Sequence, residues 1–153
     1  MIAARAAHDF SIRTLNLDLF SFEAMSKPRL EMAGLDGARF AQACMSYRCW
    51  RLFAKAASNV YHARSLGGWS ETIELSKLEA CVADEELPAA AGVRVSSTAT
   101  GSPTIEFLDD NGQPFAVAEF TMDVFAHLIG ECCDLVSVLS KGGIATIECK
   151  GSA

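Results

Sequence analysis

The hydrophobic pattern is most regular between Thr121 and Ser140. Apolar residues recur there at intervals of three and four, which is the spacing of one face of an α-helix. Thr121 is a favourable N-cap residue, and the Lys-Gly-Gly sequence at 141–143 is typical of a helix C-terminus. We therefore predict a helix from Met122 to Ser140. Its predicted buried face consists of Val124, Phe125, Leu128, Ile129, Cys132, Leu135, Val136 and Leu139.

A second amphipathic helix is predicted from Gly37 to Ser65. This stretch contains no proline and is followed by two glycines at 67–68, which favour a stop. At 100° per residue, its apolar side consists of Ala41, Met45, Cys49, Leu52, Phe53, Ala56 and Val60. The opposite side combines cations with aromatic residues, namely Arg48, Arg51, Lys55, Phe40, Tyr47, Trp50 and Tyr61.

Several shorter segments show the two-residue period of half-buried strands. The ranges that predict strands are 11–22, 69–75, 92–100 and 144–149. The stretch between Pro28 and Gly37 is interpreted as a connection, and the range 76–87, which starts with a capping-box sequence, as a short helix. Between residues 104 and 120, Asn111-Gly112 separates two apolar runs, which predicts a β-hairpin with positive φ at both central positions of its turn.

These elements predict one α+β domain spanning residues 1–153. Its mostly antiparallel sheet contains the β-hairpin at Asn111-Gly112 and packs against two main amphipathic helices. This layering is expected because each helix and each half-apolar strand must bury one side. A chain of 153 residues, of which 50% are hydrophobic, is long enough to form such a core.

Charge is distributed unevenly along the chain. The formal net charge is −6, but residues 37–70 carry five basic residues and no acidic residue, whereas residues 71–153 carry fourteen acidic and four basic residues. An acidic protein of this kind repels phosphate unless it presents one basic face by itself. We therefore expect no general nucleic-acid-binding surface, and only the middle segment offers a basic face.

Sulfur and targeting signals suggest a compartment. The six cysteines form no CxxC pair, and several occupy apolar helix positions, where free cysteine behaves as a small hydrophobe. The N-terminus has no signal-peptide pattern, and no apolar run reaches the roughly 18 residues of a membrane-spanning helix. We expect a cytoplasmic protein with reduced, structural cysteines. A redox pair at Cys132 and Cys133 is disfavoured because adjacent helix residues point in different directions.

One helix face carries groups that bind divalent metals. Asp123, His127 and Glu131 are spaced four residues apart, so their side chains are neighbours on a helix. The arrangement suggests a metal-dependent hydrolase as an alternative function. We favour a solvated helix face and predict no metal site, because such charge patterns are common on exposed helices. A metal site would also need a ligand from another element, such as Asp109, Asp110 or His62.

The favoured function is non-enzymatic. No nucleophile elbow and no glycine-rich phosphate loop occurs, and we predict no cofactor. Arginine and aromatic side chains anchor protein interfaces. We therefore expect an adaptor, regulator or inhibitor that binds a protein partner and forms a homodimer, with nucleic-acid binding as a further alternative. The predicted partner-binding residues are Arg48, Arg51, Lys55, Tyr47 and Trp50.

Overall fold

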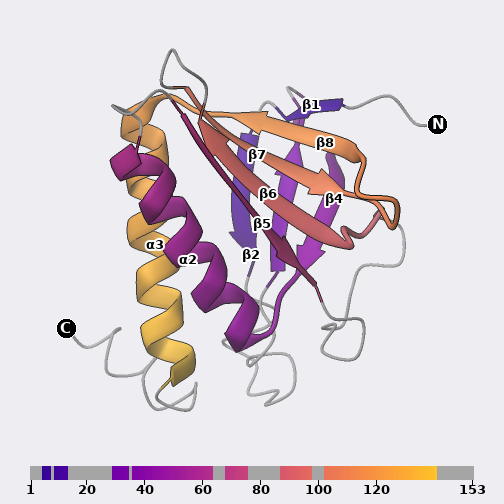
Figure 1. Ribbon diagram of the computed structural model, residues 1–153. Coiled ribbons are helices and arrows are strands. Elements are labelled where there is room, and N and C mark those ends of the chain that lie inside the picture. Colours follow the sequence, from indigo (N-terminus) through magenta and orange to yellow (C-terminus); the bar gives the residue numbers. More distant parts are fainter. Residues whose placement is uncertain are drawn as a thin grey trace.

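The computed structural model describes residues 5–7, 9–13, 29–34, 36–63, 68–75, 87–97 and 102–140. These residues form two β-sheets and two α-helices, an α+β fold (Figure 1). In chain order the elements are β1 (Arg5–Ala7), β2 (Asp9–Arg13), β3 (Arg29–Ala33), β4 (Arg39–Cys44), α2 (Tyr47–Ala63), β5 (Trp69–Glu74), β6 (Gly92–Ser97), β7 (Pro103–Leu108), β8 (Pro114–Glu119) and α3 (Met122–Ser140).

The larger sheet has the strand order β1-β8-β7-β6-β5. All of its neighbouring strands are antiparallel except β1, which pairs with β8 in parallel. Alternation along the strands gives it an apolar inner face and a polar outer face. Arg94 and Glu106 are direct cross-strand partners on the outer face, where Arg94 Nε donates to Glu106 Oε1 at 2.7 Å.

The smaller sheet has the order β2-β3-β4 and is antiparallel. Residues 87–90 run beside β4 at the edge of this sheet and form hydrogen bonds with Gln42. The Gln42 amide donates to the Pro88 carbonyl at 3.0 Å, the Ala90 amide donates to the Gln42 carbonyl at 2.8 Å, and Gln42 Nε2 donates to the Leu87 carbonyl at 2.9 Å. These bonds satisfy Gln42, which is fully buried.

The two helices lie side by side and cover the left end of both sheets in Figure 1. α2 begins after Ser46, whose Oγ accepts a hydrogen bond from the Cys49 amide at 3.2 Å. α3 begins after Thr121, whose Oγ1 accepts one from the Val124 amide at 3.3 Å, as predicted for an N-cap. The predicted bounds of α3 are confirmed.

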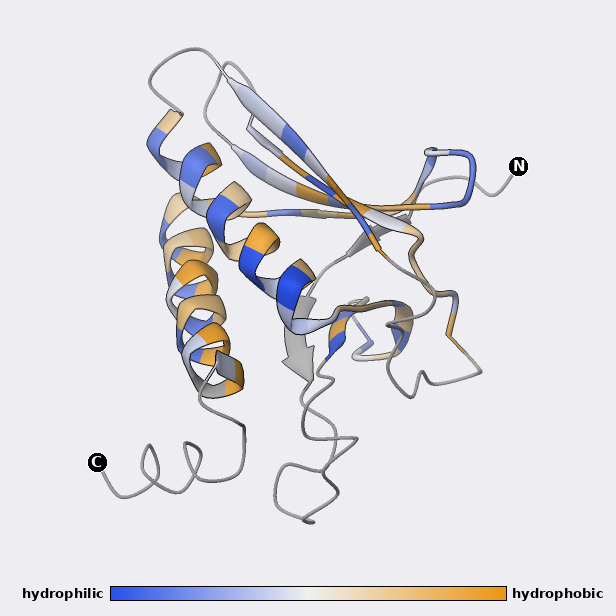
Figure 2. Ribbon diagram, turned by 60° about the horizontal axis from the view of Figure 1, so that its bottom comes forward, coloured by the Kyte–Doolittle hydropathy of each residue, from blue (hydrophilic) through white to orange (hydrophobic). Residues whose placement is uncertain are grey.

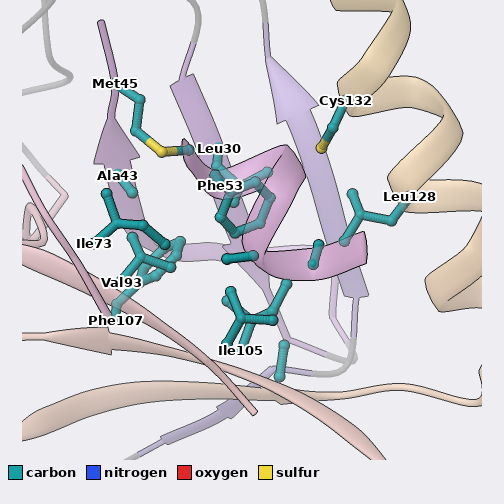
Figure 3. Close-up of a cluster of buried hydrophobic side chains, with 14 of the residues drawn as sticks. Leu30, Ala43, Met45, Phe53, Ile73, Val93, Ile105, Phe107, Leu128 and Cys132 are labelled. Atoms are coloured by element: carbon teal, nitrogen blue, oxygen red, sulfur yellow. The ribbon is translucent and has the colours of Figure 1, made fainter. Parts of the chain in front are cut away.

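The core lies where both sheets and both helices meet. Figure 3 shows Phe53 of α2 among buried side chains from the other elements, including Leu30 of β3, Ile105 of β7 and Leu128 of α3. Trp50 packs edge-to-face on Phe53, with ring centroids 5.9 Å apart. On α3, Phe125, Leu128, Cys132 and Leu135 are buried as predicted, whereas Val124 is 55% exposed and does not belong to the core.

Two predictions about the first part of the chain are wrong. The stretch interpreted as a connection between Pro28 and Gly37 contains β3, which is almost entirely buried. The predicted helix of residues 37–65 is a strand followed by a helix, because residues 39–44 form β4 and α2 starts only at Tyr47. Ala41 therefore reaches the core from a strand, and Met45 from the connection before α2. Residues 39–44 instead pair with β3, and Gly37, with a φ of 77°, lies in the turn between the two strands. The sequence interpretation missed this second hairpin.

The hairpin between β7 and β8 is confirmed, but its turn differs from the predicted one. The Gly112 amide donates to the Asp109 carbonyl at 3.0 Å, so Asp110 and Asn111 occupy the central positions. Gly112 follows with a φ of 75°. Asp109 stabilises the turn, since its Oδ1 accepts hydrogen bonds from the amides of Asn111 and Gln113, each at 2.9 Å.

The other predicted strands agree where the structure describes them. β5 and β6 occupy the predicted ranges, and β2 covers the first residues of the range 11–22. Of the predicted helix over residues 76–87, the structure describes only Leu87. The predicted strand over residues 144–149 and the rest of the range 11–22 lie outside the described residues.

Candidate functional site

The candidate site is the solvent-facing side of α2, the most cationic surface among the described residues. The buried residues of α2 are Cys49, Trp50, Phe53, Ala54, Ala56, Ala57, Val60 and Ala63. They occupy about half of the helix circumference, so the other half is left to solvent. The ribbon of α2 in Figure 2 is coloured alternately hydrophilic and hydrophobic, as expected for an amphipathic helix.

Three of the five predicted partner-binding residues supply positive charge to this side. Arg48, Arg51 and Lys55 are exposed and follow one another at intervals of three and four residues. Among the residues that the structure describes, no carboxylate lies within ion-pair distance of these three cations. α2 itself contains no acidic residue. We call Arg48, Arg51 and Lys55 the cationic face.

Tyr47 extends the cationic face at the N-terminus of α2. It is 37% exposed, and the guanidinium carbon of Arg51 lies 5.5 Å from the centre of its ring. This distance is within the range of a cation–π contact. The contact holds one arginine over an aromatic surface and leaves its charge accessible.

Trp50 is not part of this surface, contrary to the sequence-based prediction. Its side chain is fully buried against Phe53. The other predicted aromatic residues also turn inward to different degrees, since Phe40 of β4 and Tyr61 of α2 are partly buried and pack against the core. The error arises because the helix begins at Tyr47, and the buried half of α2 is wider than the predicted apolar stripe.

Leu52 shows the opposite error. The predicted apolar stripe included it, yet 44% of Leu52 is exposed. Arg48 and Lys55 are its neighbours on the helix, four residues before and three residues after it. The solvent-facing side of α2 therefore contains an apolar position between two cations, which sequence periodicity alone did not separate from the core.

α2 is fixed to strand β5 by two side-chain contacts. Asn59 Nδ2 donates to Glu71 Oε2 at 3.1 Å, and Cys49 Sγ donates to the Glu74 carbonyl at 3.8 Å. Trp69 Nε1 also donates to Glu71 Oε2, at 3.0 Å, while 46% of the Trp69 residue is exposed. No sequence pattern pointed to Trp69 or Glu71, because their roles depend on a contact between two elements.

Of the three candidate metal ligands on α3, only His127 and Glu131 contact each other. His127 Nε2 lies 3.0 Å from Glu131 Oε1, and these side chains are 77% and 51% exposed. Asp123 is exposed one turn earlier. Asp109 and Asp110 lie in the β7–β8 turn, at the opposite end of the sheet from α3 (Figure 1). In the described part of the chain, no group of three or more His, Cys, Asp or Glu residues could hold a metal ion.

The described cysteines are free thiols. Cys44, Cys49 and Cys132 are buried, and Cys133 is exposed. Burial, together with the nearby Cys133 and Glu131, raises the pKa of the Cys132 thiol far above its ordinary value, which keeps it protonated and unreactive. Cys81 and Cys149 lie outside the described residues.

A pocket of about 290 Å³ lies at the end of β5, next to the β7–β8 turn. Its acidic lining residues are Glu74, Asp109 and Asp110, and Thr72, Leu75 and Leu108 also contribute. The β5 end of the molecule therefore has a cationic side, provided by α2, and an acidic side, provided by this pocket.

No protein-family model matches the chain, and comparisons with curated proteins and with solved structures found no match either. None of the described helices combines the length and the apolar character needed to cross a membrane.

Proposed function

We propose that the protein is a non-enzymatic interaction protein, acting as an adaptor, regulator or inhibitor, and that it binds an acidic region of a protein partner through the cationic face of α2. The observation that carries the proposal is the exposure of Arg48, Arg51 and Lys55, which have no acidic partner among the described residues although the chain has a net charge of −6. Acidic chains offer many carboxylates, so three unpaired cations on one helix side favour an external partner.

The surface around the cationic face also supports a protein partner. Exposed Tyr47 and Leu52 offer apolar area beside the cations. Mixed aromatic, aliphatic and arginine surface is typical of protein interfaces, in which arginine and tyrosine contribute much of the binding energy. A nucleic-acid partner is disfavoured by the net negative charge and by the burial of Trp50, which removes one of the two aromatic residues predicted to bind the partner.

The proposed compartment is the cytoplasm. Cys44, Cys49 and Cys132 are buried free thiols, and a reducing compartment preserves such residues.

The test is a comparison of three forms of the full chain in affinity capture from the native host, followed by binding measurements with the purified captured protein. The variant Arg48→Gln/Arg51→Gln/Lys55→Gln removes three positive charges. The matched control Gln113→Glu/Ala126→Glu/Ser137→Glu lowers the net charge by the same amount at exposed positions outside α2.

We expect the wild type and the control to capture and bind the same acidic protein, and the α2 variant to bind it at least tenfold more weakly. The wild-type affinity should fall with added salt, since charge attraction is screened. Equal binding by all three forms would contradict the proposal. Tighter binding of single-stranded RNA or DNA than of any captured protein would replace it with the nucleic-acid alternative.

A further inference from the structure

β5 is the terminal strand of the larger sheet, and in the described part of the chain it pairs only with β6. The Leu75 amide donates to the Ala91 carbonyl at 3.0 Å, which fixes the alternation of this antiparallel ladder. Odd-numbered β5 residues therefore direct their peptide groups toward β6, and even-numbered residues direct theirs away. Ser70 and Thr72 are even-numbered and exposed, so their N–H and C=O groups line the outer edge of β5.

One side of α2 lies next to β5. Cys49 and Asn59 contact β5, and together with Leu52 and Ala56 they form one stripe of α2 with spacings of three and four residues. Leu52 therefore lies between the two contacts, on the side of α2 nearest β5. Leu52 is 44% exposed, so an apolar side chain is accessible to solvent beside β5. Arg48 and Lys55 flank Leu52 on the solvent side.

We propose that the partner of this protein supplies an extended acidic segment that binds as an added strand along the outer edge of β5. This inference rests on the proposed function and names the form that the partner takes. Peptide groups of the segment would bond those of Ser70 and Thr72, as in other complexes formed by strand addition. Its side chains on the α2 side would pack on Leu52 and place carboxylates next to Arg48 and Lys55.

The two sides of the β5 edge differ in charge, and this difference predicts a pattern in the partner. Side chains of an added strand alternate between the two faces of the sheet. The face opposite α2 presents Thr72, Glu74 and the pocket that Asp109 and Asp110 line. Residues of the segment on that face are therefore uncharged or basic, and the acidic residues occupy alternate positions. On the α2 face, the Glu71 carboxylate is already engaged by Asn59 and Trp69.

Charge also argues against a second copy of this chain as the occupant. Two β5 edges paired about a twofold axis would place both α2 helices on the same face of the joined sheet. The cationic faces would then approach each other, and like charges repel. The β5 edge is therefore not the surface of the homodimer expected from the sequence.

The experiment is a selection of random twelve-residue peptides, displayed on phage, against the immobilised full chain. We expect selected peptides to carry acidic residues at every second position. The peptide that binds best is then synthesised and its affinity measured for variants of the protein. In Thr72→Pro the outward N–H is lost without loss of a bond to β6, which an edge strand tolerates. We expect at least tenfold weaker binding, and binding within twofold of wild type for the control Thr72→Ala.

A second pair of variants tests the α2 side. Leu52→Asp should weaken peptide binding at least tenfold, and Leu52→Met, which keeps an apolar side chain of similar size, should bind like wild type. A peptide methylated on the backbone nitrogens of alternate residues tests strand pairing without altering the protein. One of its two alternating methylation patterns should abolish binding, and the other should retain it.

The outcomes separate this inference from the proposed function. If Arg48→Gln/Arg51→Gln/Lys55→Gln weakens binding but Thr72→Pro and both methylation patterns have no effect, strand addition is wrong and the proposed function stands. If none of these changes weakens binding, both are wrong. A selection that returns no binder, or only peptides without alternating acidic residues, overturns the inference. The inference is also overturned if a twelve-nucleotide oligothymidylate binds as tightly as the selected peptide.

Discussion

Arg29 and Glu31 form an ion pair inside the smaller sheet, with Arg29 Nε 2.9 Å from Glu31 Oε2. The same oxygen accepts a second hydrogen bond from Arg39 Nη1 of β4, also at 2.9 Å. The Glu31 side chain has no exposed surface, whereas 40% of the Arg39 side chain is exposed. The carboxylate therefore joins β3 to β4 from a buried position, where its charge depends on both arginines.

The first prediction concerns this carboxylate. Glu31→Gln should lower the free energy of unfolding by about 3 kcal/mol, because it removes the charge of one partner of a buried ion pair. Arg39→Gln should cost less than about 1 kcal/mol, because its partly exposed charge is screened by solvent. Urea unfolding monitored by circular dichroism measures both. A Glu31→Gln variant as stable as the wild type would show that the ion pair does not stabilise the sheet.

The second prediction separates the two aromatic residues at the start of α2. Trp50→Ala should lower the free energy of unfolding by about 3–5 kcal/mol, since it empties a fully buried site beside Phe53. Tyr47→Ala should cost less than about 1 kcal/mol, because its exposed ring packs little. Thermal unfolding of both variants provides the measurement. Similar losses for the two would contradict their different placement.

The third prediction follows from the raised pKa of Cys132. Above the ordinary thiol pKa of about 9, the unfolded chain loses this proton while the folded chain keeps it. The unfolded state then binds fewer protons, so stability falls as pH rises above about 9. Cys132→Ala should show a shallower fall between about pH 9 and pH 10.5 in urea unfolding. The control Cys133→Ala, which alters an exposed thiol, should keep the steeper wild-type dependence, and equal slopes for both variants would refute the assignment.

The fourth prediction concerns the hairpin turn. Gly112 has a φ of 75°, and no atom lies within 4 Å of the position that a Cβ would occupy there. Gly112→Ala should therefore cost about 1 kcal/mol through backbone strain alone. Gly112→Asn should cost less, because asparagine tolerates this conformation better than alanine. Chemical unfolding of both variants tests the order, and an Ala variant more stable than the Asn variant would contradict it.

Helix caps and turn residues correctly predicted the helix α3 and the β7–β8 hairpin. Thr121 marked the start of α3, and Asn111-Gly112 marked the hairpin, although the side chain of Asp109 shifted the turn by one residue. Ser46 was an equally local signal for the start of α2, since its hydroxyl accepts a hydrogen bond from the Cys49 amide. It was overlooked because the apolar spacing continued upstream through Ala41 and Met45, which reach the core from β4 and the connection after it.

The candidate site was predictable in its charges and not in its aromatic residues. The concentration of basic residues in one segment is a property of the sequence, and Arg48, Arg51 and Lys55 are exposed because burial of an unpaired cation is costly. Trp50 was expected to be exposed and is buried, whereas Leu52 was expected to be buried and is 44% exposed. Periodicity gives the angle of each residue around α2, but the direction of the core is fixed by where α3 and β5 pack.

The amino-acid sequence alone was enough to predict the element types of residues 92–97 and 102–140, the amphipathic character of both helices and the separation of basic from acidic segments. These features depend on neighbours in the chain, namely caps, turn residues and apolar spacing. Packing in three dimensions placed residues 39–44 beside β3, buried Glu31 between two arginines and brought the side of α2 that contains Cys49 and Asn59 against β5. These outcomes depend on which elements pack against one another, and the periodicity of a single segment does not specify its packing partners.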